Sequence, residues 1–204
     1  MTTVRESLAA VHQHRTKAGA RHVLCIPAVR QLASDPILVS LAGAFLNAQP
    51  VPFRATLFDK SSVSNWLVTW HQDIVLPLVR RVDDPMWGPW TMKAGILHAN
   101  APARALEQIV ALRVHLDDSA ESNGPLRVLP GTHASGVLTQ EAVRHAADSV
   151  RPVECIAAAG GVVAMRPLVV HASSKSTDAR PRGVLHIEYA AAVQIASGIE
   201  LAVD

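Results

Sequence analysis

The sequence predicts a mainly β fold, an antiparallel sandwich or jelly roll with helices packed on its outside. After Pro50 the chain divides into short apolar, β-branched segments separated by Pro, Gly, Asn and Asp, which is typical of all-β domains. Before Pro50 the apolar residues follow a helical pattern. Many short strands after leading helices favour two packed sheets with the helices outside them.

Two helices are expected ahead of the strands. The first covers residues 2–17, where a threonine can cap the N-terminus. The second covers about residues 36–48, because Ser34 or Asp35 can cap it, Pro36 suits its first turn and an apolar stripe follows. Both helices are expected to pack outside the sheets.

The rest of the chain is expected to form strands, interrupted by one helix at residues 139–147. Gly160 and Gly161 lie between two of the strand segments and predict a hairpin, because glycine accepts positive φ. The expected strands are 51–59, 65–70, 91–97, 107–116, 126–129, 151–156, 161–165, 168–172 and 183–191.

Length and charge limit the classes of protein to consider. The chain has 204 residues, 49% of them hydrophobic, and a formal net charge of +2. We expect one domain over residues 1–204, with residues 1–49 as its helical N-terminal part and residues 50–192 as the jelly-roll core. The small charge argues against nucleic acid as a partner. A small-molecule substrate and a monomer or small homo-oligomer are expected.

The segments that direct a protein to a membrane or out of the cell are not expected here. The N-terminus is polar and basic, and no run approaches the ~18 apolar residues that cross a bilayer. Cys25 and Cys155 are far apart in the sequence and indicate neither a zinc knuckle nor a disulfide framework. Two reduced thiols favour a cytoplasmic protein.

Two His-x-Asp patterns are candidates for a metal site. In an extended strand, residues i and i+2 point the same way, so such a pattern presents an imidazole and a carboxylate to one point. A distant third histidine completes the two-His, one-carboxylate arrangement of non-haem Fe(II) oxygenases. Strand counting favours His71 and Asp73 with His171 near the C-terminus, while His115 and Asp117 form the competing pair.

An arginine near the third histidine is a candidate for binding an anion. Arg182 opens the last expected strand, and a guanidinium can hold a carboxylate through two parallel hydrogen bonds. Arg180 is the near rival. Ser173 lies two residues after His171 and is expected on the same side of the strand.

Other residues have two possible roles. Trp87 and Trp90 lie in an expected loop with Pro and Gly, and each can pack in the core or wall a substrate pocket. His98 and His186 can be core histidines or can face the pocket. The pattern alone leaves these alternatives open.

Three blocks of the sequence resemble a known family. These blocks, LFDKSSVSNWLVTWHQD, LRVHLDDSAESNGPLRVLPGTH and MRPLVVHASSKSTDARPRGVLHIEYA, together span roughly residues 50–192. They are similar to the phytanoyl-CoA dioxygenase family of Fe(II)/2-oxoglutarate oxygenases. The resemblance implies a double-stranded β-helix and a dioxygenase that uses Fe(II), O2 and 2-oxoglutarate, hydroxylates a small organic substrate and releases succinate and CO2.

The resemblance also implies roles for individual residues and favours the first His-x-Asp. It implies His71, Asp73 and His171 as catalytic iron ligands and Arg182 and Ser173 as 2-oxoglutarate contacts. The residues that it places at the pocket, with less certain individual roles, are Gln72, Lys93, Trp87 and Trp90. The chain is short for the family, which weighs against a bulky CoA thioester as substrate.

Two other functions are compatible with the same residues. One is a jelly-roll hydrolase or isomerase that uses another metal. The other is a non-catalytic jelly roll that binds a small acid. Neither would turn over 2-oxoglutarate, so that reaction separates them from an oxygenase.

Overall fold

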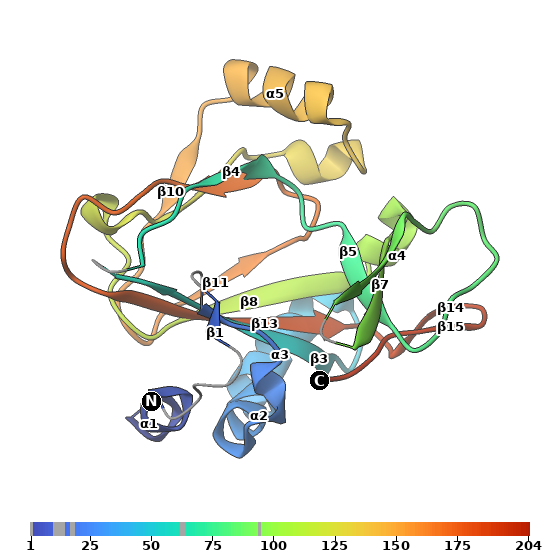
Figure 1. Ribbon diagram of the computed structural model, residues 1–204, viewed down its shortest axis with the longest axis horizontal. Helices are drawn as coiled ribbons and strands as arrows, with labels where there is room; N and C mark the ends of the chain where they lie inside the picture. The colour runs from blue at the N-terminus through green and yellow to red at the C-terminus, as the bar shows by residue number, and fades with distance from the viewer. Residues whose placement is uncertain (1, 10–14, 17–18, 62–63, 94) are drawn as a thin grey trace.

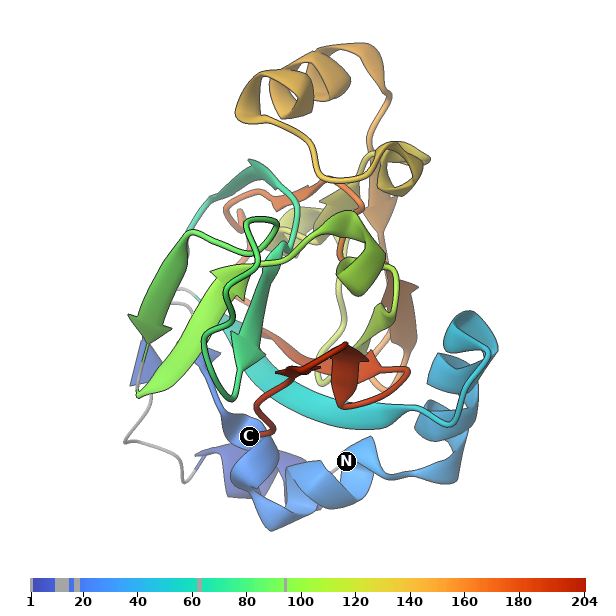
Figure 2. The ribbon, with the colours of Figure 1, turned by 90° about the vertical axis from the view of Figure 1, so that its right-hand side faces the viewer.

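Two antiparallel sheets face each other in the computed structural model, which describes residues 2–9, 15–16, 19–61, 64–93 and 95–204 (Figure 1). The major sheet has the strand order β1-β2-β3-β13-β8-β11, and the minor sheet has the order β10-β9-β12-β4. A third sheet, β5-β7-β6, lies at one end of the two (Figures 1 and 2). This arrangement confirms the expected mainly β jelly roll.

The strands are short, as expected, except for β3 and β13. These two run antiparallel side by side in the centre of the major sheet and carry many of the inward-facing polar side chains. The strands are β1 (Arg15–Thr16), β2 (Gly19–Ala20), β3 (Val51–Lys60), β4 (Val68–His71), β5 (Val75–Leu78), β6 (Trp90–Lys93), β7 (Ile96–Asn100), β8 (Ile109–His115), β9 (Leu126–Val128), β10 (Val153–Cys155), β11 (Val162–Met165), β12 (His171–Ser173), β13 (Arg182–Ala190), β14 (Gln194–Ala196) and β15 (Ile199–Glu200).

Helices cover the outer faces of both sheets (Figure 1). On the major sheet lie α1 (Thr2–Ala9), α2 (Pro27–Ala33) and α3 (Pro36–Leu46), and on the minor sheet lies α5 (Gln140–Ser149). The short helix α4 (Ala103–Leu106) precedes β8, and three 3-10 turns are η1 (Val23–Cys25), η2 (Glu121–Asn123) and η3 (Thr132–Ser135). None of the described helices is long and apolar enough to cross a membrane.

The core beneath α1–α3 follows from the alternation of strand residues. Val110, Leu112 and Val114 of β8 face the helices and are buried against them, because successive strand residues point to opposite faces. The opposite residues of the same strand, including Arg113 and His115, face the interior between the two sheets. The outer face holds the helices by apolar packing, and the inner face carries the polar groups.

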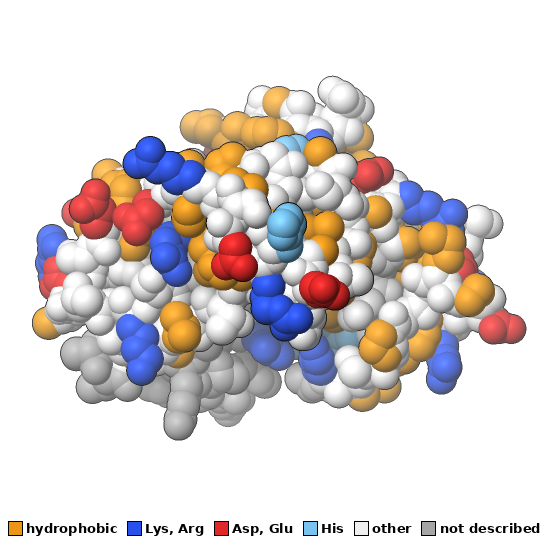
Figure 3. Space-filling view, turned by 90° about the horizontal axis from the view of Figure 1, so that it is seen from above, with side chains coloured by type: hydrophobic (Ala, Val, Ile, Leu, Met, Phe, Trp, Pro, Cys, Tyr) orange, Lys and Arg blue, Asp and Glu red, His pale blue; other side chains and the backbone are white. Residues whose placement is uncertain are grey.

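The outer surface above the minor sheet shows no concentration of one charge. Figure 3 views the face that carries α5, where acidic, basic and apolar side chains are interspersed. A mixed surface of this kind offers no basic stripe for a nucleic-acid backbone.

The N-terminal part differs from the expectation. The helix expected over 2–17 ends at Ala9, residues 10–14 and 17–18 lie outside the described residues, and Arg15–Thr16 form a strand. The helix prediction is wrong at residues 15–16 because β1 and β2 add to the edge of β3, and pairing with an open sheet edge outweighs local helix propensity. Helix α2 was not predicted.

Gly19 permits this pairing. A Cβ atom at Gly19 would lie 1.8 Å from the carbonyl oxygen of Leu57, and its φ is +131°. Only glycine therefore allows β2 to approach β3 so closely.

Three expectations about the strands are also corrected. The strand expected over 91–97 is a hairpin, β6 and β7, that turns at Gly95 with φ +78°. The segment expected over 168–172 begins its strand only at His171. The predicted hairpin at Gly160-Gly161 is wrong, since the strands on either side belong to different sheets: β10 pairs with β9, and β11 pairs with β8.

Tyr189 joins the major sheet to helix α2. Its side chain is fully buried, and its hydroxyl donates to the carbonyl oxygen of Ala33 at 2.9 Å. Replacing Tyr189→Phe should lower the free energy of unfolding by about 1–3 kcal/mol, because the buried carbonyl would lose its partner. Denaturant unfolding would measure this, with Ser40→Ala on exposed α3 as the control; equal stability would mean that another donor satisfies Ala33.

Candidate active site

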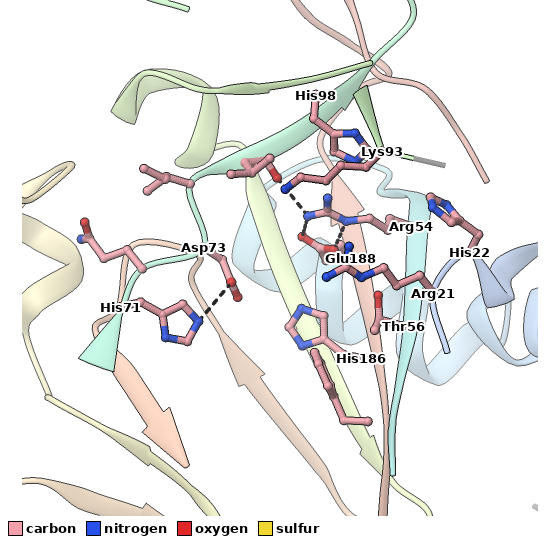
Figure 4. Close-up of a pocket in the computed structure, with 14 residues that line it drawn as sticks. Arg21, His22, Arg54, Thr56, His71, Asp73, Lys93, His98, His186 and Glu188 are labelled. Carbon is pink, nitrogen blue, oxygen red and sulfur yellow. Dashed lines mark hydrogen bonds and ion pairs between the residues drawn. The ribbon is translucent and has the colours of Figure 1, made fainter. Parts of the chain in front are cut away.

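Three potential metal ligands converge inside the sandwich at the end of β4. His71, Asp73 and His171 each offer one ligand atom, and these atoms lie within 4.8 Å of one another. The Nε2 atom of His71 lies 3.7 Å from one Asp73 oxygen, and the Nε2 atom of His171 lies 3.5 Å from the other. Figure 4 shows His71 and Asp73 turned toward each other. The structure thus brings together the three residues that the sequence indicated.

Strand pairing produces this convergence. His71 of β4 is the direct cross-strand partner of His171 of β12, and their ring centroids lie 4.2 Å apart. Asp73 follows two residues later, and its backbone N–H donates to the carbonyl oxygen of Pro167. The antiparallel register therefore places the late histidine opposite the early His-x-Asp.

Gln72 lies between these two residues and its amide is engaged elsewhere. The amide nitrogen donates to the carbonyl oxygens of Gly136 and Leu168, and the amide oxygen accepts from the N–H of Leu138. These bonds attach the strand end to two loops and hold His71 and Asp73 facing the opposite way. Although Gln72 borders a cavity, its amide serves the backbone rather than a bound ligand.

The hydrogen bonds of the two histidines fix their tautomers. The Nδ1 atom of His71 lies 2.8 Å from the carbonyl oxygen of Thr69, and that of His171 lies 2.9 Å from the carbonyl oxygen of Val169. A carbonyl only accepts, so Nδ1 carries the proton and Nε2 presents a lone pair. Two lone pairs and a carboxylate then point at one another, which is a donor set that fits a divalent cation.

The ionisation states agree with this donor set. Burial lowers the pKa of His171, so the ring stays neutral and able to bind a metal. Burial raises the pKa of Asp73, but the neighbouring His171, His186 and His71 outweigh burial and hold its pKa below the ordinary value. Asp73 is therefore an anion at neutral pH.

The competing pair, His115 and Asp117, does not form a metal site. The two Asp117 oxygens accept from Arg5 at 2.8 Å and from the N–H of Gly183 at 2.7 Å. His115 is 1% exposed, and neither ring nitrogen has a partner among the described residues. Asp117 thus serves backbone and surface contacts, and His115 lies alone in the interior.

A small cavity of about 80 Å³ adjoins the three ligands and contains two buried arginines. Arg113 is 6% exposed and Arg182 is 2% exposed. Within the described residues, Nε of Arg113 and Nη1 of Arg182 have no hydrogen-bond partner. Burial lowers the pKa of each arginine to about 10, so both stay charged at neutral pH.

Arg182 and Ser173 lie where the sequence analysis expected them, in the wall of this cavity. Nε of Arg182 donates to the carbonyl oxygen of Asn123 at 3.2 Å, which orients the guanidinium. The rival Arg180 is exposed and paired with Asp178 on the surface. Of the two arginines, Arg182 is therefore the one that lies in the cavity wall.

Lys60 is a third buried cation beside this cavity. It is the cross-strand partner of Arg182, is 1% exposed, and donates to Ser173 Oγ at 2.9 Å and to the carbonyl oxygen of Ser174. Burial, with a contribution from Arg182, lowers the pKa of Lys60 to about 8. Gly124 leaves room for this amine, because a Cβ there would lie 3.0 Å from it.

A larger cavity of about 480 Å³ also borders His71 and Asp73 (Figure 4). It shares His71, Asp73 and Phe58 with the small cavity. The additional residues that line it are Arg21, His22, Arg54, Thr56, Gln72, Ile74, Val75, Lys93, His98, His186 and Glu188. Lys93 therefore lines a cavity, as the resemblance implied, and so do His98 and His186, whose roles the sequence left open.

The two loop tryptophans do not line either cavity. Trp87 is 4% exposed in the apolar core, and Trp90 packs against the same core. Trp90 also borders a separate surface groove with Arg81. The structure thus places Trp90 away from the ligands, and core packing is the role that it supports for both side chains.

The sequence analysis missed Lys60, Arg113 and the Arg54–Glu188 pair. All four side chains face the interior from β3, β8 or β13. Charged residues at alternate positions of otherwise apolar strands were the available signal, since buried charges are rare without a partner or ligand.

Comparison with known proteins gives one family match and one curated relative. The family profile described as Phytanoyl-CoA dioxygenase (PhyH) matches residues 4–184. L-proline trans-4-hydroxylase from Streptomyces griseoviridis is 26% identical over 185 residues, which cover 78% of this chain and 61% of that protein. The chain therefore spans less than two thirds of that relative's length.

Solved structures with a similar fold include two bacterial proteins. EctD from S. alaskensis, with 2-oxoglutarate and 5-hydroxyectoine, superposes with a TM-score of 0.70 at 19% identity and covers 95% of this chain and 66% of that chain. AviO1 from Streptomyces viridochromogenes Tue57 has a TM-score of 0.64 at 21% identity, covering 93% and 80%. At these sequence identities, the structural similarity shows a shared fold and nothing further.

The isolated His115 should make the protein sensitive to acid. Burial, with Arg113 and Arg182, lowers its pKa from 6.5 to about 4. Between these values the unfolded chain binds a proton that the folded chain does not, so the free energy of unfolding falls as the pH decreases from 6.5 to 4. His115→Leu should remove up to about 3 kcal/mol of this loss.

Urea unfolding at pH 7 and at pH 4.5 would measure the change, with His145→Leu on exposed α5 as the matched control. An unaltered pH dependence in His115→Leu would mean that His115 finds a proton acceptor in the folded state.

Proposed function

The chain belongs to the phytanoyl-CoA dioxygenase family, and from this premise we propose that it is a 2-oxoglutarate-dependent non-haem iron oxygenase. In the proposed reaction a substrate C–H, O2 and 2-oxoglutarate become C–OH, succinate and CO2. One observation carries the proposal: three metal ligands and two buried arginines with unpaired nitrogens border the same small cavity.

His71, Asp73 and His171 are the proposed iron ligands. Two neutral imidazoles and one carboxylate suit Fe(II) and leave positions open for exogenous ligands. Bound Fe(II) supplies the redox chemistry by which O2 is reduced while 2-oxoglutarate is oxidised. The chain contributes the fixed Nε2 lone pairs of the histidines and the anionic charge of Asp73.

The cations of the small cavity are proposed to bind 2-oxoglutarate. Lys60, Arg113 and Arg182 give three positive charges at this end of the interior, and Asp73 is the anion among the residues that line the cavity. Buried charges without a counterion are costly, so this cluster favours a dianionic ligand. Arg182 and Ser173 are the proposed contacts of one carboxylate, and Arg113 lines the same cavity.

The apolar lining of the small cavity supports the same chemistry. Phe58, Trp66 and Leu126 form its walls together with Val68 and Ala172. These side chains limit access of water, which strengthens the charge interactions inside. A compact, positively charged cavity with apolar walls is suited to a small dicarboxylate.

The relatives do not identify the substrate of this protein. The proline hydroxylase is matched over only 61% of its length, and the structural neighbours share the fold. We propose a small organic substrate in the larger cavity, because 480 Å³ is within the range of small-molecule sites. The free thiols of Cys25 and Cys155 support the cytoplasm as its location.

Removing one proposed iron ligand should strongly weaken metal binding. His71→Ala or Asp73→Ala should weaken Fe(II) binding at least about 100-fold, because two ligands remain. His115→Ala should bind Fe(II) like the unaltered protein. Anaerobic equilibrium dialysis would measure the affinities. If His115→Ala loses Fe(II) binding and His71→Ala retains it, the assignment of the metal to His71 and Asp73 is wrong.

Removing either buried arginine should weaken the binding of 2-oxoglutarate. In Arg182→Gln or Arg113→Gln the dissociation constant should rise about 10- to 100-fold, the usual cost of a charge-assisted hydrogen bond. The visible charge-transfer band of 2-oxoglutarate chelated to Fe(II) would report binding in an anaerobic titration.

The exposed Arg180→Gln is the matched control for this titration and should leave the affinity unchanged. If no band forms although Fe(II) is bound, the oxygenase proposal fails. If the band forms with equal affinity in Arg182→Gln, the assignment of the carboxylate site is wrong.

A further inference from the structure

The charges of the larger cavity allow a class of substrate to be named, on the basis of the proposed function above. This cavity borders His71 and Asp73, and it is lined by neither Arg113 nor Arg182 of the small cavity. A molecule bound there would place a C–H next to the metal ligands without displacing the dianion. Its charged walls therefore select the substrate and not the co-substrate.

At the base of the cavity, Arg54 and Glu188 neutralise each other. Nε and Nη2 of Arg54 donate to the two oxygens of Glu188, and Nη2 also donates to the carbonyl oxygen of Val75. The two side chains are 17% and 4% exposed. A bidentate pair of this kind is rigid and adds no net charge to the cavity.

Two further cations have no such partner. Arg21 follows β2 and Lys93 ends β6, so they approach the cavity from different walls. Figure 4 shows both side chains directed toward the Arg54–Glu188 pair. Among the described residues neither has a hydrogen bond or an ion pair, which leaves an excess of two positive charges beside the neutral pair.

The cavity histidines do not change this balance. Burial lowers the pKa of His186 to about 3, so this ring is neutral. His22 is bonded through Nδ1 to a carboxylate oxygen of Asp204 at 2.6 Å. His98 donates from Nδ1 to the carbonyl oxygen of Ile96 at 2.9 Å, and burial lowers its pKa, so it is neutral. The net charge away from the metal ligands is therefore set by Arg21 and Lys93.

We infer that the substrate is a small carboxylic acid whose carboxylate binds between Arg21 and Lys93. Two exposed cations from opposite walls match one carboxylate, which can accept from both. The nearby carboxylate of Glu188 disfavours a dianion such as a phosphate ester at the same point. The carboxylate fixes one end of the substrate, and the cavity extends from there to His71 and Asp73.

Calorimetric titration of the metal-free protein would test this inference. The probes are small hydroxy, amino and imino acids, each paired with its primary amide, so that each pair differs in charge and little else. We expect at least one acid to bind and its amide to bind at least about 10-fold more weakly. Binding should weaken as the salt concentration rises, because exposed charges are screened.

Substitutions locate the bound acid. Arg21→Gln and Lys93→Gln should each weaken the binding of the acid about 10-fold, and Lys93→Glu should weaken it more strongly. Arg144→Gln on exposed α5 removes the same charge and should leave the affinity unchanged. Arg113→Gln distinguishes the two cavities: an acid that is weakened by Arg113→Gln but not by Arg21→Gln occupies the small cavity and overturns the inference. Equal affinity of acids and amides, or binding of none of the acids, overturns it as well.

The iron and 2-oxoglutarate band separates this inference from the proposed function. It should form normally in Arg21→Gln and Lys93→Gln, because these residues lie outside the small cavity. If it is absent even in the unaltered protein while acids still bind in a charge-dependent way, the oxygenase proposal falls and the acid site remains. If the band forms and the acids do not bind, the oxygenase proposal is supported and the inferred acid site is wrong.

Discussion

The pairing of β4 with β12 is the constraint on which the site depends. It sets His71 directly opposite His171, two residues separated by a hundred positions of chain. A slip of one residue would turn the histidine away from the interior, because strand side chains alternate between faces. The three hydrogen bonds of Gln72 to surrounding backbone oppose such a slip, so a residue that points away from the site maintains its geometry.

The second constraint is the positive charge enclosed between the sheets. Lys60, Arg113 and Arg182 are each less than a tenth exposed, and burial lowers the pKa of all three. Their desolvation opposes folding and is offset by the apolar packing of the outer faces. An anionic ligand would relieve this cost, so ligand affinity and fold stability are linked in this part of the molecule.

The parts of the site that local sequence can specify were predicted, and those that depend on register were not. His71 and Asp73 could be predicted because residues i and i+2 share a face in extended backbone. His171 and Arg182 could be predicted because His171 ends one clear apolar segment and Arg182 begins another. Lys60 and Arg113 were missed because their inward direction follows from pairing with distant strands. In the fold, β1 and β2 were missed for the same reason, since they exist as additions to the edge of β3.

The larger cavity adds walls from outlying parts of the chain to those that it shares with the small cavity. The metal ligands come from β4 and β12, within the jelly roll, whereas Arg21 follows the β1–β2 hairpin and Lys93 belongs to the separate sheet at the end. Under the proposed function, the part of the substrate site that carries Arg21 and Lys93 is therefore built separately from the metal centre. Substitutions in the two outlying segments can retune what the protein accepts while the common chemistry is inherited unchanged, which is a physical route by which one scaffold acquires many substrates.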